Sequence, residues 1–203
     1  MSYPDIFRAT VVGVKASDGV AIASDKRLSY GDFVLSRNAK KMFIINNNIA
    51  IAFAGLYGDA GGLVRILEAE LKNYEMVTGA TLTTRMVAKR LATIMYYYKF
   101  FPFFVEVLVA GVKGRPELYA LDPLGSILEE DYVAVGSGAT LAFGVLEREY
   151  REGISLESAE KLAIASVRAA ISRDVGSGDG IDVIAISPSG VRERSIRLKI
   201  VEG

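Results

Sequence analysis

The sequence contains neither histidine nor cysteine. Their absence excludes a catalytic site that depends on a histidine base, a cysteine nucleophile, a disulfide framework, and a zinc site built on either residue. Any nucleophilic chemistry must therefore use serine, threonine, lysine, tyrosine or a carboxylate. We expect neither a metal nor a cofactor.

An excess of charge of one sign is also absent. Lysine and arginine together number 24, aspartate and glutamate together number 24, and the formal net charge is zero. Proteins that bind nucleic acid or anionic membranes through basic patches normally carry an excess of positive charge. We therefore expect neither a nucleic acid nor a membrane as a partner.

Long hydrophobic runs are missing as well. Residues 1–8 contain no apolar stretch long enough for a signal peptide. The longest apolar segment, residues 100–112, is interrupted by Pro102 and Glu106 and is too short to span a bilayer. These absences predict a cytoplasmic protein.

The sequence does contain enough hydrophobic residues to form one core. The chain has 203 residues, of which 51% are hydrophobic, as expected for one folded domain. Apolar runs and helical spacing predict strands, two helices, more strands, two more helices and final strands. The expected strands are residues 11–14, 20–23, 42–45, 49–54, 103–112, 117–121, 132–135, 182–187 and 191–200. The expected helices are residues 59–75, 81–99, 139–151 and 156–172.

The expected strands are more continuously apolar than alternating, as in residues 20–23 and 49–54. Strands of this kind are buried on both faces. Two central sheets with a pair of helices on each outer side satisfy both this burial and the order of the elements. The predicted fold class is therefore α+β, with four layers in the order αββα.

Local signals fix several ends of these elements. Asp18-Gly19 is a hairpin signal, and the run of three asparagines at residues 46–48 suits a tight turn. Pro102 stops the second helix, and Ser155 is a plausible N-cap for the fourth.

Two glycine-rich loops raise the possibility of a nucleotide-binding module. Gly136-Ser137-Gly138 follows a strand and opens a helix, which is the right context for a phosphate loop, but residue 141 is leucine where the dinucleotide fingerprint has its third glycine. The second loop, residues 176–180, follows a helix and opens a strand. The nucleotide-binding interpretation is therefore a minor alternative.

Charged residues stand at the ends of two buried strands. Asp25-Lys26-Arg27 closes one strand, and Lys40-Lys41 opens another. Charges in such positions are often only solvated or paired. Alone, they do not identify a site.

Several further motifs occur in one order along the chain. They are Thr10-Val-Val-Gly13, Asp18-Gly-Val-Ala-Ile-Ala-Ser-Asp-Lys-Arg27, Lys40-Lys41, Ala54-Gly-Leu-Tyr-Gly-Asp59, Gly136-Ser-Gly138, Gly144-Val-Leu-Glu147, Arg173-Asp-Val-Gly-Ser177 and Gly180-Ile-Asp182. Together they make the chain resemble an archaeal proteasome beta subunit over essentially its whole length.

The resemblance implies a four-layer αββα fold of the N-terminal-nucleophile hydrolase type. It also implies seven-membered beta rings stacked between alpha rings, so the expected partners are alpha subunits, other beta subunits and unfolded polypeptide substrates. In this family a threonine exposed by removal of a propeptide attacks the peptide carbonyl. Its own freed α-amine helps to move the proton.

The resemblance also assigns roles to individual residues. Lys41 is the lysine that stabilises the alkoxide, Asp25 is the carboxylate that holds this lysine, and Gly55 donates a backbone N–H to the oxyanion. The supporting network consists of Ser137, Asp174 and Ser177. The substrate pocket is expected to be lined by Leu28, Ser29, Phe53 and Tyr57.

The chain departs from the family at the nucleophile. Counting back from Gly13 places Ala9 at that position, and the spacings from Ala9 to the other expected site residues agree with the family without a gap. Alanine has no hydroxyl. The residue before the cleavage point is usually glycine in the family, and here it is Arg8.

Thr10 is the alternative nucleophile. Side chains alternate across a strand, so Thr10 is expected to point to the opposite face unless the strand slips or bulges. We therefore predict a catalytically silent beta subunit with an active sibling subunit, in which residues 1–8 form a retained propeptide-like segment and residues 9–203 form the domain. The alternative is an active threonine endopeptidase processed between Ala9 and Thr10.

The aromatic run at residues 96–101, which reads Tyr-Tyr-Tyr-Lys-Phe-Phe, is expected to take part in a subunit interface. The alternative is that these rings fill the core of this domain.

Overall fold

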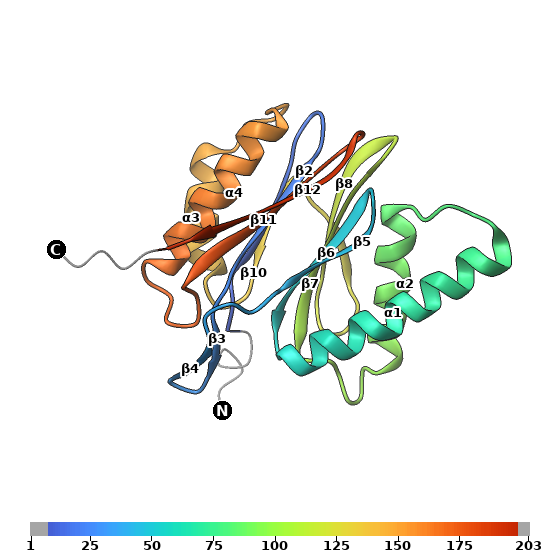
Figure 1. Cartoon of the computed structure of the whole chain (residues 1–203), viewed down its shortest axis with the longest axis horizontal. Helices are drawn as coiled ribbons and strands as arrows, with labels where there is room; N and C mark the ends of the chain where they lie inside the picture. The colour runs from blue at the N-terminus through green and yellow to red at the C-terminus, as the bar shows by residue number, and fades with distance from the viewer. Residues whose placement is uncertain (1–7, 199–203) are drawn as a thin grey trace.

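The computed structural model describes residues 8–198. Two five-stranded sheets pack face to face, and a pair of helices covers the outer face of each sheet (Figure 1). This arrangement confirms the predicted four-layer αββα sandwich. Residues 1–7, which carry most of the predicted propeptide-like segment, and residues 199–203 lie outside the described part of the chain.

The first sheet has the strand order β10-β1-β2-β11-β12. Its strands in this order are Tyr132–Val135, Val11–Lys15, Val20–Asp25, Gly180–Ser187 and Gly190–Arg197. All of its pairings are antiparallel. β2 is buried along its whole length, because one face packs on the other sheet and the opposite face packs on helices.

The second sheet has the order β5-β6-β7-β8-β9. Its strands are Met42–Asn46, Ile49–Gly55, Val105–Lys113, Arg115–Leu121 and Ile127–Glu129. The asparagine turn between β5 and β6 is present, and the side chain of Asn46 accepts a hydrogen bond from the backbone N–H of Asn48 at 2.9 Å. β9 was not predicted, since a strand of three residues carries too little pattern.

A third, two-stranded sheet projects from one end of the sandwich (Figure 1). It consists of β3, Leu28–Tyr30, and β4, Phe33–Ser36, joined by a turn at Gly31-Asp32. This hairpin was not predicted from the sequence. It leaves three large hydrophobic side chains largely exposed, Tyr30, Phe33 and Leu35.

The helix pairs are α1, Tyr57–Thr78, with α2, Thr84–Tyr97, and α3, Ala139–Glu149, with α4, Leu156–Ile171. The bounds of α1, α2 and α3 differ from the predicted ranges by two or three residues at one or both ends, and α4 ends one residue early. α1 is longer than predicted and stops at Gly79, whose φ of 64° is a left-handed cap. Thr83 caps α2 by accepting from the backbone N–H of Met86, and Ser155 caps α4 as predicted.

The buried hydrophobic residues form three clusters, and each cluster lies between two adjacent layers of secondary structure. One cluster lies between α1, α2 and the second sheet, one between the two sheets, and one between the first sheet and α3 and α4. Because side chains alternate along β1 and the residues just before it, this segment contributes to two of the clusters. Ala9 and Val11 belong to the layer between the sheets, whereas Val12 and Val14 belong to the layer under the helices.

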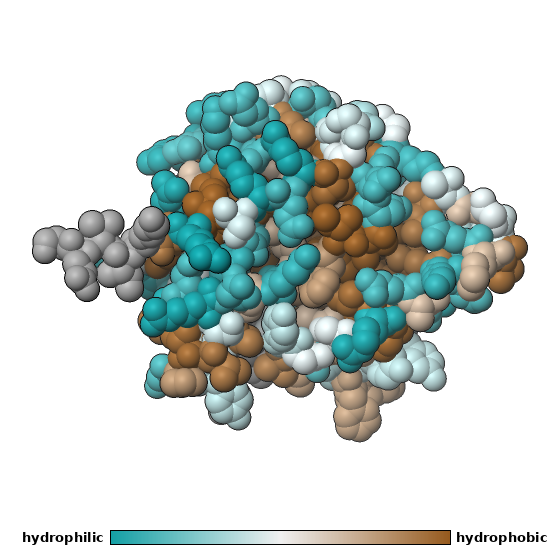
Figure 2. Space-filling view, in the orientation of Figure 1, coloured by the Kyte–Doolittle hydropathy of each residue, from teal (hydrophilic) through white to brown (hydrophobic). Residues whose placement is uncertain are grey.

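The predicted aromatic run lies at the end of α2 and in the loop that follows it. Tyr97, Phe100 and Phe101 are 80%, 83% and 89% exposed, so these rings do not fill the core. Figure 2 shows hydrophobic residues gathered along the lower edge of the view, around the β3–β4 hairpin and at the tip of the α2–β7 loop.

Candidate active site

The centre of the site is a buried ion pair between Asp25, the last residue of β2, and Lys41, which directly precedes β5. The Lys41 ammonium Nζ donates to Asp25 Oδ1 at 2.6 Å. The Lys41 side chain is 5% exposed and the Asp25 side chain is not exposed at all. The structure thus joins two residues that the resemblance had assigned to one site.

Asp25 is also tied to the backbone of three separate segments. Its Oδ1 accepts from the backbone N–H of Thr10 at 2.9 Å, and its Oδ2 accepts from those of Arg27 at 2.9 Å and Gly178 at 3.0 Å. With Lys41, four donors meet the two oxygens. A buried carboxylate needs such partners to offset its desolvation.

Ala9 lies against the turn that joins β10 to α3. Its N–H donates to Ser137 Oγ at 3.3 Å, and its carbonyl accepts from the N–H of Gly138 at 3.4 Å. Gly136 has a φ of 94°, and a Cβ at this residue would stand 2.2 Å from the carbonyl oxygen of Ala9. The close approach and the left-handed conformation both require glycine, and the turn thereby holds residue 9 in place.

This contact also removes the basis for the nucleotide-binding interpretation of Gly136-Ser137-Gly138. The turn already surrounds the Ala9 carbonyl of its own chain.

Within residues 8–198, no group of three or more acidic side chains is arranged to hold a metal ion. No helix in the same range is long and apolar enough to cross a membrane.

Thr10 points to a different part of the site from Ala9. Its hydroxyl Oγ1 lies 2.7 Å from Ser177 Oγ, and the residue is completely buried. A Cβ added to Gly138 would meet this hydroxyl at 2.0 Å and the methyl group of Ala170 in α4 at 2.7 Å. Thr10 therefore faces the helix side of the first sheet, as the alternation along β1 requires.

Asp174 links the two serines of the expected supporting network. Its Oδ2 accepts from Ser137 Oγ at 2.7 Å and from Ser177 Oγ at 2.6 Å, and its Oδ1 accepts from the backbone N–H of Gly176 at 3.2 Å. The network runs from Ala9 through Ser137, Asp174 and Ser177 to Thr10. It therefore connects the backbone of residue 9 with the side chain of residue 10.

Gly55, at the end of β6, lines the cavity next to Ala9 and Lys41. Its φ is 134°, and a Cβ here would stand 2.2 Å from the carbonyl oxygen of Phe104. Only glycine fits this strained and crowded position.

The four expected pocket residues line two adjoining cavities beside residue 9. Phe53 lines the inner cavity, Ser29 lines the outer cavity, and Leu28 and Tyr57 line both. The inner cavity has about 10 Å³ of free space, roughly enough for one water molecule. The outer cavity has about 310 Å³. Arg8 lines both of them.

Glu106 on β7 is a residue that sequence reasoning missed. Its Oε2 accepts from the backbone N–H of Gly136 at 2.8 Å, and it stands opposite Ala54 in the β6–β7 ladder. The carboxylate thus ties the second sheet to the turn that holds Ala9. Burial, as the largest cause, raises the pKa of Glu106 above its usual value, and the nearby Asp122 acts in the same direction.

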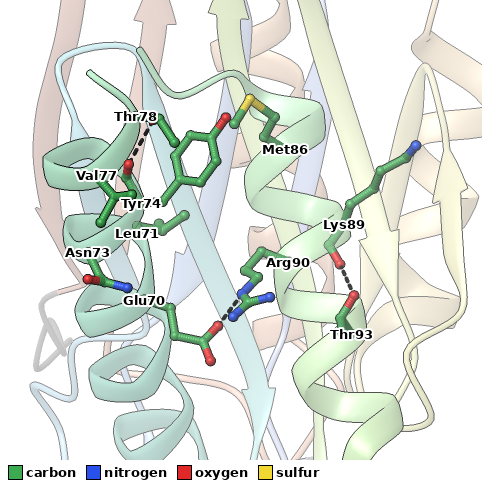
Figure 3. A pocket seen from close by; sticks show the side chains of 10 residues that line it. All are labelled: Glu70, Leu71, Asn73, Tyr74, Val77, Thr78, Met86, Lys89, Arg90 and Thr93. Carbon is green, nitrogen blue, oxygen red and sulfur yellow. Dashed lines mark hydrogen bonds and ion pairs between the residues drawn. The ribbon is translucent and has the colours of Figure 1, made fainter. Parts of the chain in front are cut away.

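A roomier cavity of about 470 Å³ lies elsewhere, between the C-terminal half of α1 and α2 (Figure 3). Its walls include Leu71, Tyr74 and Met86, and an ion pair between Glu70 and Arg90 spans the two helices. None of the expected site residues lines it. The size of a cavity therefore does not locate the chemistry in this molecule.

The four-layer sandwich is consistent with the N-terminal-nucleophile hydrolase fold, and the buried lysine–aspartate pair lies beside the start of β1. The sequence comparisons narrow this class. Residues 7–186 match the family described as "Proteasome subunit". The chain therefore belongs to the proteasome subunit family.

Three relatives indicate the beta type. "Proteasome subunit beta 1" of Desulfurococcus amylolyticus is 49% identical over 196 residues, covering 96% of this chain and 97% of the relative. "Proteasome subunit beta 1" of Hyperthermus butylicus is 48% identical, with 92% of each chain covered. "Proteasome subunit beta 2" of Pyrobaculum neutrophilum is 43% identical, covering 95% of this chain and 96% of the relative.

Proposed function

We propose that this beta subunit is catalytically silent and contributes to the structure of the proteasome core particle. The observation that carries the proposal is the methyl group of Ala9, which lines the same cavity as Lys41 and Gly55. A threonine there would place its hydroxyl beside a buried ammonium group that stabilises an alkoxide. Alanine offers no atom that can attack a carbonyl.

The geometry of Thr10 supports the same proposal. Its hydroxyl is hydrogen-bonded to Ser177 and fully buried on the helix side of the sheet. To act as the nucleophile, Thr10 would have to exchange faces with Ala9, which requires a shift of β1 by one residue. Such a shift would break the register of β1 with β2 and β10, which is continuous through Val11.

Self-processing needs an internal nucleophile, so we expect the bond between Arg8 and Ala9 to remain intact. In the proposed function, residues 1–8 stay attached, and residues 9–203 form the domain. The subunit enters heptameric beta rings between alpha rings, and a sibling beta subunit supplies the threonine protease activity toward unfolded polypeptides. The particle is expected in the cytoplasm.

The exposed aromatic rings support the assembly part of the proposal. Tyr97, Phe100 and Phe101 are exposed at the end of α2 and just after it, and three other hydrophobic side chains are exposed on the β3–β4 hairpin. Exposed groups of large apolar side chains mark interaction surfaces in soluble proteins.

The mass of the chain in assembled particles tests the proposal. The chain should be co-expressed with alpha subunits and a second beta subunit, and its mass measured after purification of the particle. We expect a chain that still carries residues 1–8. A chain that begins at Thr10, formed without added protease, would instead identify an active threonine endopeptidase, and a strictly monomeric chain would count against assembly.

A further inference from the structure

The two edges of the first sheet carry charges of opposite sign at the same level along the strands. β10 forms one edge and β12 forms the other, and no further strand within residues 8–198 pairs with either. The register places Tyr132 of β10 and Arg192 of β12 in one row across the sheet. The residues between them in this row are Val14, Ala21 and Ala185.

An acidic recess opens around Tyr132. This cavity of about 470 Å³ lies where β8, β9, β10 and α3 meet. Glu130, Asp131 and Glu147 line it, and none of its lining residues carries a positive charge. Lys15 pairs with Asp131, whereas Glu130 and Glu147 have no ion-pair partner among the described residues. The recess therefore keeps a net negative charge.

The carboxylates of the recess act on the phenol of Tyr132. Its hydrogen bond to Glu147 is the largest cause that raises the pKa of Tyr132, and burial and the charges of Glu147, Asp131 and Glu130 act in the same direction. A positively charged group from outside would relieve this accumulation of negative charge.

The opposite edge presents two arginines. Arg192 Nη2 and Arg194 Nη2 each lie 2.6 Å from a carboxylate oxygen of Glu160 in α4. Their side chains are 70% and 54% exposed, whereas that of Glu160 is 8% exposed. Glu193, between them, pairs with Lys40. One carboxylate thus faces two guanidinium groups, and each of these has further N–H donors for a second carboxylate.

We propose that the arginine edge of one copy of this chain docks on the acidic recess of the next copy, with Arg192 and Arg194 facing Glu130 and Glu147. The inference rests on the proposed function for the formation of beta rings, and it adds which surfaces meet and by what chemistry. Both surfaces belong to this chain, so the partner is a second copy of it.

The geometry of the sheet supports a head-to-tail contact. Because the two surfaces lie at opposite ends of one row, copies placed side by side bring them together without a shift along the strands. A contact between two different surfaces is heterologous, and it forms a ring when the rotation between copies closes. Like charges disfavour acid against acid and base against base, so the same residues oppose a symmetric contact through either edge.

A pair of introduced cysteines reports this contact directly, because the chain has none of its own. Leu128→Cys places a thiol at the acidic recess, and Ser189→Cys places one in the turn before β12; both positions are exposed. In particles assembled with alpha subunits and no second beta subunit, a bismaleimide with a flexible spacer should join the double variant into covalent multimers beyond the dimer. Neither single variant should form them, since a head-to-tail contact keeps the same residue of two copies apart.

Charge reversal tests whether the contact is electrostatic. Glu147→Lys and Arg192→Glu should each lower recovery of the chain in these particles by about fivefold or more, because an attraction becomes a repulsion. The two substitutions together restore opposite charges, so recovery should return to within about twofold of the unmodified chain. Such a return also shows that neither single change acts by unfolding. Arg194 stays in place to hold the buried Glu160. Lys113→Glu, at the exposed end of the central strand β7, is the control and should leave recovery unchanged.

Three results would overturn the assignment of the two surfaces. They are a double-cysteine variant without multimers beyond the dimer, a single-cysteine variant with as many, and a combined charge variant that assembles no better than the single ones. A chain that enters particles only with a second beta subunit would overturn a second copy as the partner. The mass test of the silent subunit is independent of all these results, so this inference and the proposed function can fail separately.

Discussion

Lys41→Met is expected to destabilise the isolated subunit by about 3 kcal/mol. Removing one partner from a buried ion pair typically costs about 3–5 kcal/mol, because the other charge is left buried without compensation. The Lys41 side chain is 5% exposed and the Asp25 side chain 0%, so solvent cannot replace the lost ammonium. We expect the lower end of the range because the N–H groups of Thr10, Arg27 and Gly178 still donate to Asp25.

Asp25→Asn should cost more, about 5 kcal/mol. The substitution leaves the Lys41 ammonium buried without its carboxylate. It also turns one of the two oxygens into an NH₂ group, which would face backbone N–H donors on the side of Oδ1 or Oδ2. The predicted order, with the aspartate variant less stable than the lysine variant, follows from these backbone contacts alone.

Urea denaturation followed by far-ultraviolet circular dichroism measures both variants, since the chain has no tryptophan for fluorescence. A loss of about 3 kcal/mol corresponds to a fall in melting temperature of roughly 6–12 °C for a chain of this size. Lys15→Met is the matched control. The pair of Lys15 with Asp131 is partly exposed, so its loss should cost about 1 kcal/mol or less. A cost of less than about 1 kcal/mol for Lys41→Met would refute the reasoning that the pair stabilises the fold.

Three other predictions concern the remaining parts of the molecule. Glu106→Gln should stabilise the fold at neutral pH. The folded state favours the protonated acid because its pKa is raised, and that contribution is lost as the pH rises through the folded-state pKa. Urea melts from about pH 4 upward should show the advantage of glutamine growing with pH, and a constant difference would contradict this. Ala9→Thr alone should give little activity, whereas Arg8→Gly with Ala9→Thr should self-process and cleave small peptide amides. A double variant that assembles but stays inactive would show that the site has changed beyond its nucleophile. Phe100→Ser with Phe101→Ser should reduce recovery of the chain in rings while leaving its melting temperature unchanged, because both rings are exposed. Unchanged ring recovery would contradict an interface role.

The layers of the fold could be predicted from the sequence because their signals are local. Continuous apolar strands such as residues 20–23 require cover on both faces, and the asparagine turn and the Ser155 cap fix where elements begin. The β3–β4 hairpin has no such signal. Its strands have only three and four residues, and its apolar side chains point to solvent instead of a core.

Part of the site could likewise be predicted from the sequence, and part of it could not. The pairing of Asp25 with Lys41 followed from the family resemblance, and the opposite orientations of Ala9 and Thr10 followed from the alternation of a strand. Glu106 could not be found, because its partner is the backbone N–H of Gly136, 30 residues away. A backbone N–H is present at almost every residue, so no sequence motif predicts which one the Glu106 carboxylate accepts from.

The hydrogen bonds of Asp25 to three backbone segments make this residue important for folding, whether or not the subunit is catalytic. Residues 10, 27 and 178 come from the start of β1, the end of β2 and the approach to β11, so one carboxylate closes the end of the first sheet. A lineage that loses the hydroxyl at residue 9 gains no freedom to lose Asp25, or the Lys41 that neutralises it, since either loss would destabilise the subunit by several kcal/mol. Catalysis can therefore disappear through a single substitution, while the remainder of its machinery is preserved by selection for folding. The route back to activity stays correspondingly short.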